Sequence, residues 1–202
     1  MLKFRSTLAD IARRAAQSLA MLACIATLSL APAEAGSLSG TYVLAPADID
    51  TGFSVKVLGR GPVTGQFQKV SGTMILNQNR PEKSRVTVDV DLRSIETGSD
   101  RITDFLKSSA MFNVAKHPIA RFESTSVRIT GENSAEVEGV LTMRGQKKRT
   151  RLSVTVNGET SSSRVDFQVS GGFFRSLYGM EAGLPIYADK VNLKINGTGR
   201  RS

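Results

Sequence analysis

Residues 85–92, Arg85-Val86-Thr87-Val88-Asp89-Val90-Asp91-Leu92, alternate polar and apolar side chains with a period of two. Successive side chains of a β-strand point to opposite faces, so this stretch predicts a strand with one buried and one solvated face. Asp89 and Asp91 fall on the polar face. A solvated outer face explains these two carboxylates better than a paired acid and base or a calcium site does.

The same alternation recurs along the chain and predicts an all-β domain. Clear strands are expected at residues 53–57, 152–156, 165–169 and 191–195, and weaker ones at 41–44, 64–76, 119–129 and 135–143. Turn-forming residues separate them at 77–81, 131–133, 144–146 and 157–158. Short connections make consecutive strands antiparallel, which allows either a sandwich or a closed barrel with its apolar face inward.

Two segments, residues 98–118 and 171–188, break the alternation. The first predicts a short helical segment near 99–113, with Ser99 or Asp100 as its N-cap and apolar residues at helical spacing after it. Both segments are apolar where a solvated loop is polar. They therefore either fill the ends of the structure as core or border an apolar ligand cavity.

The N-terminal 35 residues have the order of a secretory signal peptide. Basic residues precede the apolar run 19–30, and Ala33-Glu34-Ala35 resembles a cleavage site. We expect residues 1–35 to be removed and residues 36–202 to form one exported domain with a formal charge of +7. Cys24, the only cysteine, leaves with the leader, which excludes disulfides and thiol catalysis from the domain.

The residues favour a binding protein over an enzyme. His117 is the only imidazole and lies in a Lys-His-Pro turn, so we expect no catalytic residues, metal or cofactor. Five cations lie within eight positions of one predicted hairpin: Arg144, Lys147, Lys148, Arg149 and Arg151. They form either a solvated turn or a contact to an anionic membrane surface. An exported protein gives no reason to expect a nucleic-acid partner.

Four motifs in register resemble the YceI-like family of bacterial envelope proteins. The motifs are Gly65-Gln66-Phe67, the stretch from Arg93 to Ser124, the stretch Gly139 to Gly145, and Phe174 to Met180 with Asp189-Lys190-Val191. The resemblance implies an extended, eight-stranded, antiparallel, lipocalin-like barrel in the periplasm. It also implies that the barrel interior binds a long isoprenoid lipid, such as a polyprenyl chain or a ubiquinone-like molecule.

The inner face of such a barrel would line a lipid pocket. The expected lining residues are Phe53, Val55, Val57, Phe67, Val88, Val90, Phe105, Leu106, Phe112, Phe122, Val154, Phe167, Phe173, Phe174, Tyr178 and Leu193. The predicted function is transport, storage or sequestration of the lipid. The alternative is an envelope interaction module that docks through the basic hairpin to a membrane protein or an anionic surface.

Overall fold

The computed structural model describes residues 37–161 and 163–202, and the expected signal peptide lies outside them. Eleven strands are present in this part of the chain: β1 (Gly40–Leu44), β2 (Ile49–Val57), β3 (Arg60–Phe67), β4 (Val70–Leu76), β5 (Arg85–Asp91), β6 (Ile95–Thr97), β7 (Ile119–Gly131), β8 (Ser134–Met143), β9 (Gln146–Ser161), β10 (Arg164–Phe174) and β11 (Tyr187–Arg201). The helices are α2 (Asp100–Lys107) and the 3-10 turns η1 (Pro46–Asp48), η2 (Pro81–Lys83), η3 (Leu92–Ser94) and η4 (Arg175–Tyr178). Within these residues, no helix has the length and apolar character needed to span a bilayer.

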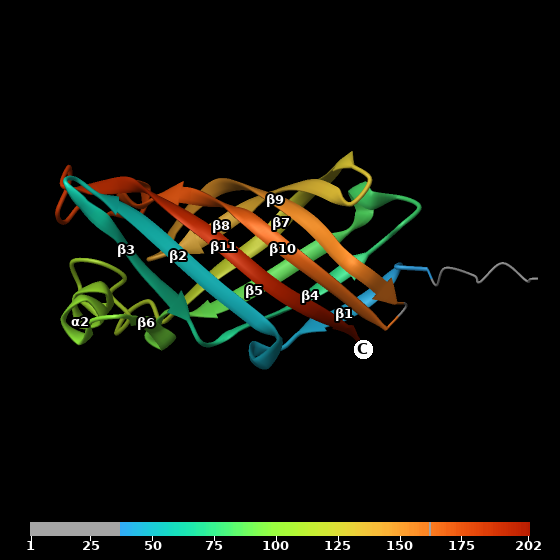
Figure 1. The fold of residues 1–202 in the computed structure, drawn as a ribbon, viewed down its shortest axis with the longest axis horizontal. Coiled ribbons are helices and arrows are strands. Elements are labelled where there is room, and N and C mark those ends of the chain that lie inside the picture. The colour runs from blue at the N-terminus through green and yellow to red at the C-terminus, as the bar shows by residue number, and fades with distance from the viewer. Residues whose placement is uncertain (1–36, 162) are drawn as a thin grey trace, which may run out of the picture. The chain divides into compact units, whose positions relative to one another are not determined.

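Eight strands close into an antiparallel barrel, in the order β1-β4-β5-β7-β8-β9-β10-β11, with β11 pairing back to β1. The expected all-β, eight-stranded barrel with one short helix is confirmed. Strands β2, β3 and β6 extend the sheet from β11, which pairs with β2 along most of its length and with β1 only at Arg200 and Arg201. Helix α2 and β6 lie at one end of the barrel and the C-terminus lies at the other (Figure 1).

Three local expectations were wrong. Residues 64–76 form parts of two strands, because β3 ends at Phe67 and β4 begins at Val70. Asn157 and Gly158 lie within β9, and Gly171–Phe174 still belongs to β10. Two glycines followed by two phenylalanines hide the alternation in that last stretch, although the backbone pairs with β11 through Phe174 and Lys190.

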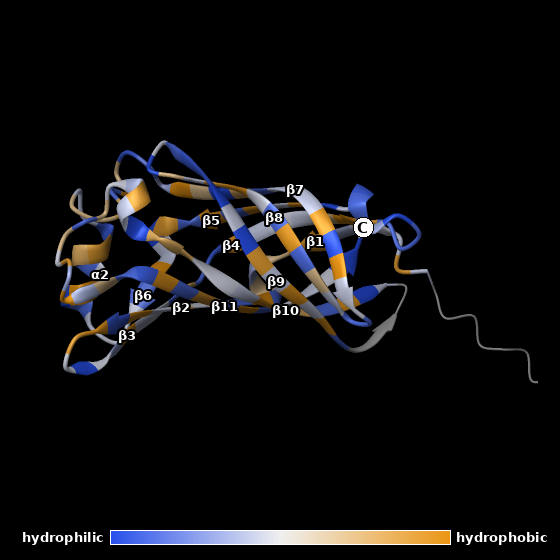
Figure 2. Ribbon diagram, turned by 90° about the horizontal axis from the view of Figure 1, so that it is seen from above, coloured by the Kyte–Doolittle hydropathy of each residue, from blue (hydrophilic) through white to orange (hydrophobic). Residues whose placement is uncertain are grey.

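Strand β5 carries the alternation that decides the fold. Its valines line the barrel interior, while Asp89 accepts two hydrogen bonds of 2.7 Å from Arg121 on β7. These bonds hold the pKa of Asp89 below its usual range, and Arg93 does the same for the pKa of Asp91. Both carboxylates therefore form ion pairs with arginine side chains on the outer face. Figure 2 shows the same banding of apolar and polar residues along β8 and β9.

Two apolar clusters hold the barrel. One contains the fully buried Tyr42, with Met74 and Val165. The Tyr42 hydroxyl donates to the backbone carbonyl of Leu38 at 3.0 Å, and the Arg201 guanidinium lies 5.4 Å from the centre of its ring. This cluster thus sits where β1 meets β11. The second and larger cluster occupies the end that carries α2 and is described below.

The closure makes Tyr42 a sensitive position. We expect Tyr42→Ala to lower the free energy of unfolding by about 3–5 kcal/mol, because it empties a fully enclosed site. Tyr42→Phe keeps the ring and loses one hydrogen bond, so it should cost only about 1 kcal/mol. Urea denaturation measures both values. Equal losses for the two variants would contradict the role assigned to ring packing.

Candidate functional site: an apolar cavity in the barrel

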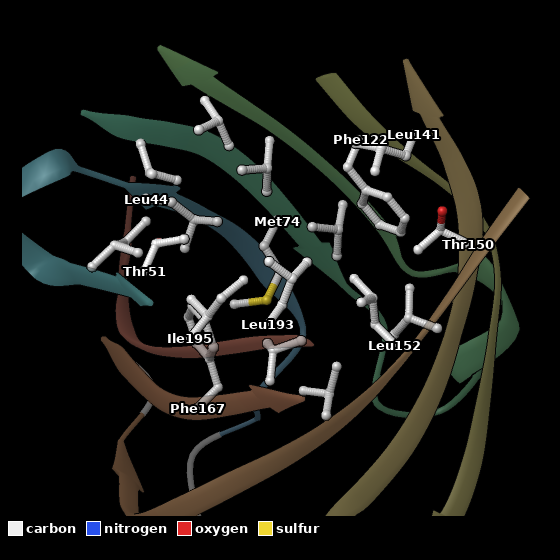
Figure 3. A pocket seen from close by; sticks show the side chains of 18 of the residues that line it. Leu44, Thr51, Met74, Phe122, Leu141, Thr150, Leu152, Phe167, Leu193 and Ile195 are labelled. Atoms are coloured by element: carbon white, nitrogen blue, oxygen red, sulfur yellow. The ribbon is translucent and has the colours of Figure 1, made fainter. Parts of the chain in front are cut away.

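A cavity of about 550 Å³ lies inside the barrel. Its wall consists mainly of inward-pointing aliphatic and aromatic side chains from the barrel strands and from β2. Figure 3 shows Met74, Phe122, Leu152 and Leu193 converging on this space from different strands. Only two charged side chains among the described residues line the cavity, Glu132 and Arg175, and they come from its opposite ends. The interior is therefore a dry tube suited to an apolar ligand.

The α2 end of the tube is closed by packed aromatic side chains. The rings of Phe53 and Phe67 are 5.6 Å apart, and Phe112 packs against Phe67 at 6.0 Å. Phe112 comes from the segment after α2, and Met180 of the segment after η4 is buried in the same cluster. Both alternatives for the apolar segments therefore hold, because the segments fill this end as core and also form the floor of the cavity.

Arg175 fixes the segment between η4 and β11. Its guanidinium, only 2% exposed, donates to the carbonyls of Met180, Ala182, Tyr187 and Ala188 at 2.6–3.1 Å. Burial lowers the pKa of Arg175, whereas the nearby Asp189 raises it. Asp189 itself binds the backbone amide and hydroxyl of Ser176. The hydrogen bonds of Arg175 thus hold the segment between η4 and β11 in place at the closed end of the cavity.

The opposite end of the cavity is a polar mouth. Its rim consists of the segments after β4 and β7, together with Leu38 before β1. Gln78, Glu132 and Asn133 on this rim are exposed. Gln78 also accepts a hydrogen bond from the Leu38 amide at 2.9 Å, which ties two parts of the rim together. The exposed polar groups of the rim therefore lie at the end opposite the packed floor.

Glycines keep the tube wide. A Cβ atom at any of three glycines would lie within 2.7 Å of an aromatic ring on a neighbouring strand. The pairs are Gly65 with Phe53, Gly139 with Phe122, and Gly197 with Phe167. Each ring occupies the space that a side chain on the neighbouring strand would otherwise fill, so it lies against the wall and leaves the centre of the tube open.

The structure brings most of the predicted lining residues together. The cavity wall includes Phe53, Val55, Phe67, Val88, Val90, Leu106, Phe112, Phe122, Val154, Phe167, Phe173 and Leu193. Alternation identified the strand positions Phe53, Val55, Val88, Val90, Val154, Phe167 and Leu193, because each strand keeps one face toward the interior. The other five were expected as large apolar residues in the helical segment, in loops or near strand ends. Their contact with a ligand stays a prediction.

Four predicted lining residues lie elsewhere. Val57 is the last residue of β2 and lies outside the cavity wall. Phe105 is 46% exposed on α2, and Phe174 is 51% exposed on the outer face of β10. Tyr178 is buried but does not line the cavity, because its ring packs edge-on against Phe173, which does.

The basic hairpin is only partly free. Arg144 donates to the carbonyls of Gly179 and Ser109, so it ties the β8–β9 turn to the segments that close the floor. Arg151 forms ion pairs with Glu136 and Glu138. Lys147, Lys148 and Arg149 form no ion pair with any described residue. Their contact with a membrane stays a prediction.

Two hydroxyl groups in the apolar wall were not anticipated. The Thr51 side-chain oxygen is buried and has no hydrogen-bond partner among the described residues. Thr150 is also buried. The nearby Tyr178 hydroxyl, whose pKa burial raises, donates to the backbone carbonyl of Leu141 at 3.4 Å. The strand expected at residues 152–156 stops short of Thr150, so the alternation gave no indication of its place in the wall.

Among the described residues, the titratable side chains that line the cavity are Glu132 and Arg175. His117 does not line it. In the part of the chain that the structure describes, no group of three or more His, Cys, Asp or Glu side chains could hold a metal ion. The arrangement supports enclosure of an apolar molecule, with polar groups at the two ends.

Comparison with known proteins agrees with this geometry. A family model described as the YceI-like domain matches residues 42–198. A UPF0312 protein of Pseudomonas savastanoi pv. phaseolicola is 35% identical over 107 residues, which are 53% of this chain and 56% of that protein. The chain thus spans just over half the length of that relative.

Two solved structures share the fold. BcnA of Burkholderia cenocepacia matches with a TM-score of 0.70 and 22% identity, covering 77% of this chain and 98% of that one. A polyisoprenoid binding domain from Saccharophagus degradans matches with a TM-score of 0.62 and 18% identity, covering 81% and 99%. At these identities the likeness concerns the fold.

The two wall threonines give a paired prediction. Thr51→Val removes a buried hydroxyl without a partner, so we expect it to raise the free energy of unfolding by about 1 kcal/mol. Thr150→Val is the matched control, because the Thr150 hydroxyl is not a buried group left without a partner, so it should bring no such gain. Urea denaturation of ligand-free protein measures both values. Destabilisation by Thr51→Val would show that its hydroxyl does have a partner.

Proposed function

This chain belongs to the YceI-like family, and on that premise we propose that it binds a long isoprenoid or similar lipid inside its barrel. A polyprenyl chain or a ubiquinone-like molecule has the required chemistry. The observation that carries the proposal is the apolar cavity of about 550 Å³, with charged side chains only at its ends. The polyisoprenoid binding domain that shares the fold supports the same ligand class.

The physical basis is a balance between two apolar environments. Moving a lipid tail from water into the barrel gains about 0.8 kcal/mol for each buried methylene. A bilayer offers the tail nearly the same gain, so transfer between membrane and barrel costs little. A protein of this kind needs a dry lining and an entrance, both of which the described residues provide. It needs no catalytic group, and the proposed role is that of a carrier or store.

The proposed setting is the periplasm. The charged, apolar and small-residue order of residues 1–35 supports export, and the YceI-like resemblance agrees with it. In that compartment a lipid cannot cross the aqueous space unaided. Enclosure of the tail in the barrel would allow its transport, storage or sequestration.

Cavity filling tests the proposal. Val154 points into the cavity, whereas its neighbour Thr155 is exposed on the outer face of β9. We expect Val154→Trp to reduce the lipid that co-purifies with the protein from its own periplasm at least tenfold, because the indole occupies the space of the tail. Thr155→Trp is the matched control and should retain the lipid. Native mass spectrometry and lipid extraction measure the occupancy.

Two results would contradict lipid binding. One is a folded wild-type protein that neither carries lipid nor binds polyprenyl probes. The other is equal occupancy in Val154→Trp and Thr155→Trp, since the cavity would then not hold the lipid. Thermal unfolding of both variants checks that the barrel is intact.

The second candidate function is docking of the hairpin to an anionic membrane surface or a membrane protein. The exposed Lys147 and Arg149, free of ion pairs among the described residues, favour it. Each basic residue near an anionic membrane contributes about 1 kcal/mol. Docking through the hairpin is compatible with lipid binding in the cavity.

Charge reversal separates the two functions. We expect Lys147→Glu to reduce sedimentation with phosphatidylglycerol vesicles, while Lys83→Glu, an exposed cation beside the mouth, leaves it unchanged. If membrane association is reduced while lipid occupancy is retained, docking is a separate function. Unchanged sedimentation of Lys147→Glu would exclude this cation of the hairpin as a docking contact.

A further inference from the structure

The barrel wall opens between β9 and β10 near its closed end. The ladder between these strands ends at the pair Leu152–Gly171. Beyond that pair β9 continues along β8 through Lys148, and β10 continues along β11 through Phe174. Two neighbouring strands therefore separate while each remains paired on its other side.

A groove of about 360 Å³ occupies this gap. Its lining includes Thr150 and Phe173, which also line the main cavity, and Arg149 and Phe174, which are exposed on the outside. The groove therefore reaches from the outer surface to side chains that also line the main cavity, with the buried Tyr178 between them. Figure 3 shows Thr150 from the cavity side, beside Leu141 and Leu152. We call this gap the side portal.

The side portal is strongly cationic. Lys148, Arg149, Arg151 and Lys190 line it, and no carboxylate does. Arg151 is paired with glutamates of β8, but the other three cations form no ion pair with a described residue. Lys190 comes from β11, 39 or more positions along the sequence from the three cations of β9. Apolar surface lies beside them, because Leu177 is 49% exposed at the same groove.

We propose that the side portal binds the anionic phosphate group of the lipid whose tail occupies the cavity. This inference rests on the proposed function. Lysine and arginine give phosphate oxygens charge-assisted hydrogen bonds, and Arg149 can offer two in parallel. The apolar side chains beside the cations suit the first carbons of the tail. The portal thus favours a lipid phosphate over a lipid with an uncharged headgroup.

The test compares two probes that share a tail. Calorimetric titration of the full chain, stripped of lipid, uses geranylgeranyl monophosphate and geranylgeraniol. Lys148→Gln with Arg149→Gln removes two portal cations, and Lys147→Gln removes a hairpin cation that does not line the portal. We expect the double variant to bind the phosphate at least tenfold more weakly and the alcohol equally well. Lys147→Gln should change neither affinity.

The outcomes separate this inference from the proposed function. Binding of the alcohol and the phosphate with equal affinity would overturn the portal assignment and leave lipid binding intact. Equal effects of Lys147→Gln and the portal variant would also overturn it, since they would indicate a diffuse surface charge. Failure of the folded wild type to bind either probe contradicts lipid binding itself.

Inorganic phosphate distinguishes the two sources of the anion. We expect it to compete with geranylgeranyl monophosphate only at concentrations at least a hundredfold higher, and not to displace the alcohol. If it binds as tightly as the monophosphate, the site takes free phosphate and the tail contributes nothing, which would overturn the assignment to a lipid.

Discussion

The structure depends on the way β11 divides its pairing among three strands. One edge runs along β10 over its whole length, while the other edge pairs first with β2 and then, at Arg200 and Arg201, with β1. A strand of 15 residues extends over about 50 Å, which is long enough to serve both partners. The last two pairs convert an open sheet into a barrel. Tyr42 covers that junction from inside, and the inward alternation of every other strand has a cavity to face only because the junction closes.

A closed barrel with a cavity along its axis must draw its packing energy from elsewhere. The aromatic cluster around Phe67 and Phe112 packs at the closed end, and the cluster around Tyr42 and Met74 packs where β1 meets β11. Between them, backbone ladders hold the wall without requiring side chains to meet across the tube. The glycines opposite Phe122 and Phe167 contribute to the same result, because they let bulky rings rest against the wall. Stability and an unfilled cavity are therefore compatible in one small domain.

Alternation predicted the inner face well wherever pairing was regular, as at Val88, Val154 and Leu193. It failed at Val57, the last residue of β2, which lies outside the cavity wall. Phe174 was expected at the pocket only as a large apolar residue near a strand end, and it is exposed on the outer face of β10. The structural role of Arg175 could not be predicted from the sequence. Its partners are four backbone carbonyls, which every residue has, so no residue type marks them. The side portal was hidden for a different reason. It exists only because β9 and β10 stop pairing, and a list of cations from one hairpin could not include Lys190 of β11.

The polar groups at the two openings would decide how a ligand lies in the tube. The mouth presents neutral amides and one carboxylate, Glu132, whereas the side portal presents only cations among its charged groups. An uncharged headgroup would find hydrogen-bonding partners at the mouth, with its tail directed toward the floor. An anionic headgroup would be repelled by Glu132 and attracted to Lys148 and Arg149, with its tail directed toward the mouth. Headgroup charge would then set the orientation of the lipid, and the same apolar lining would serve both.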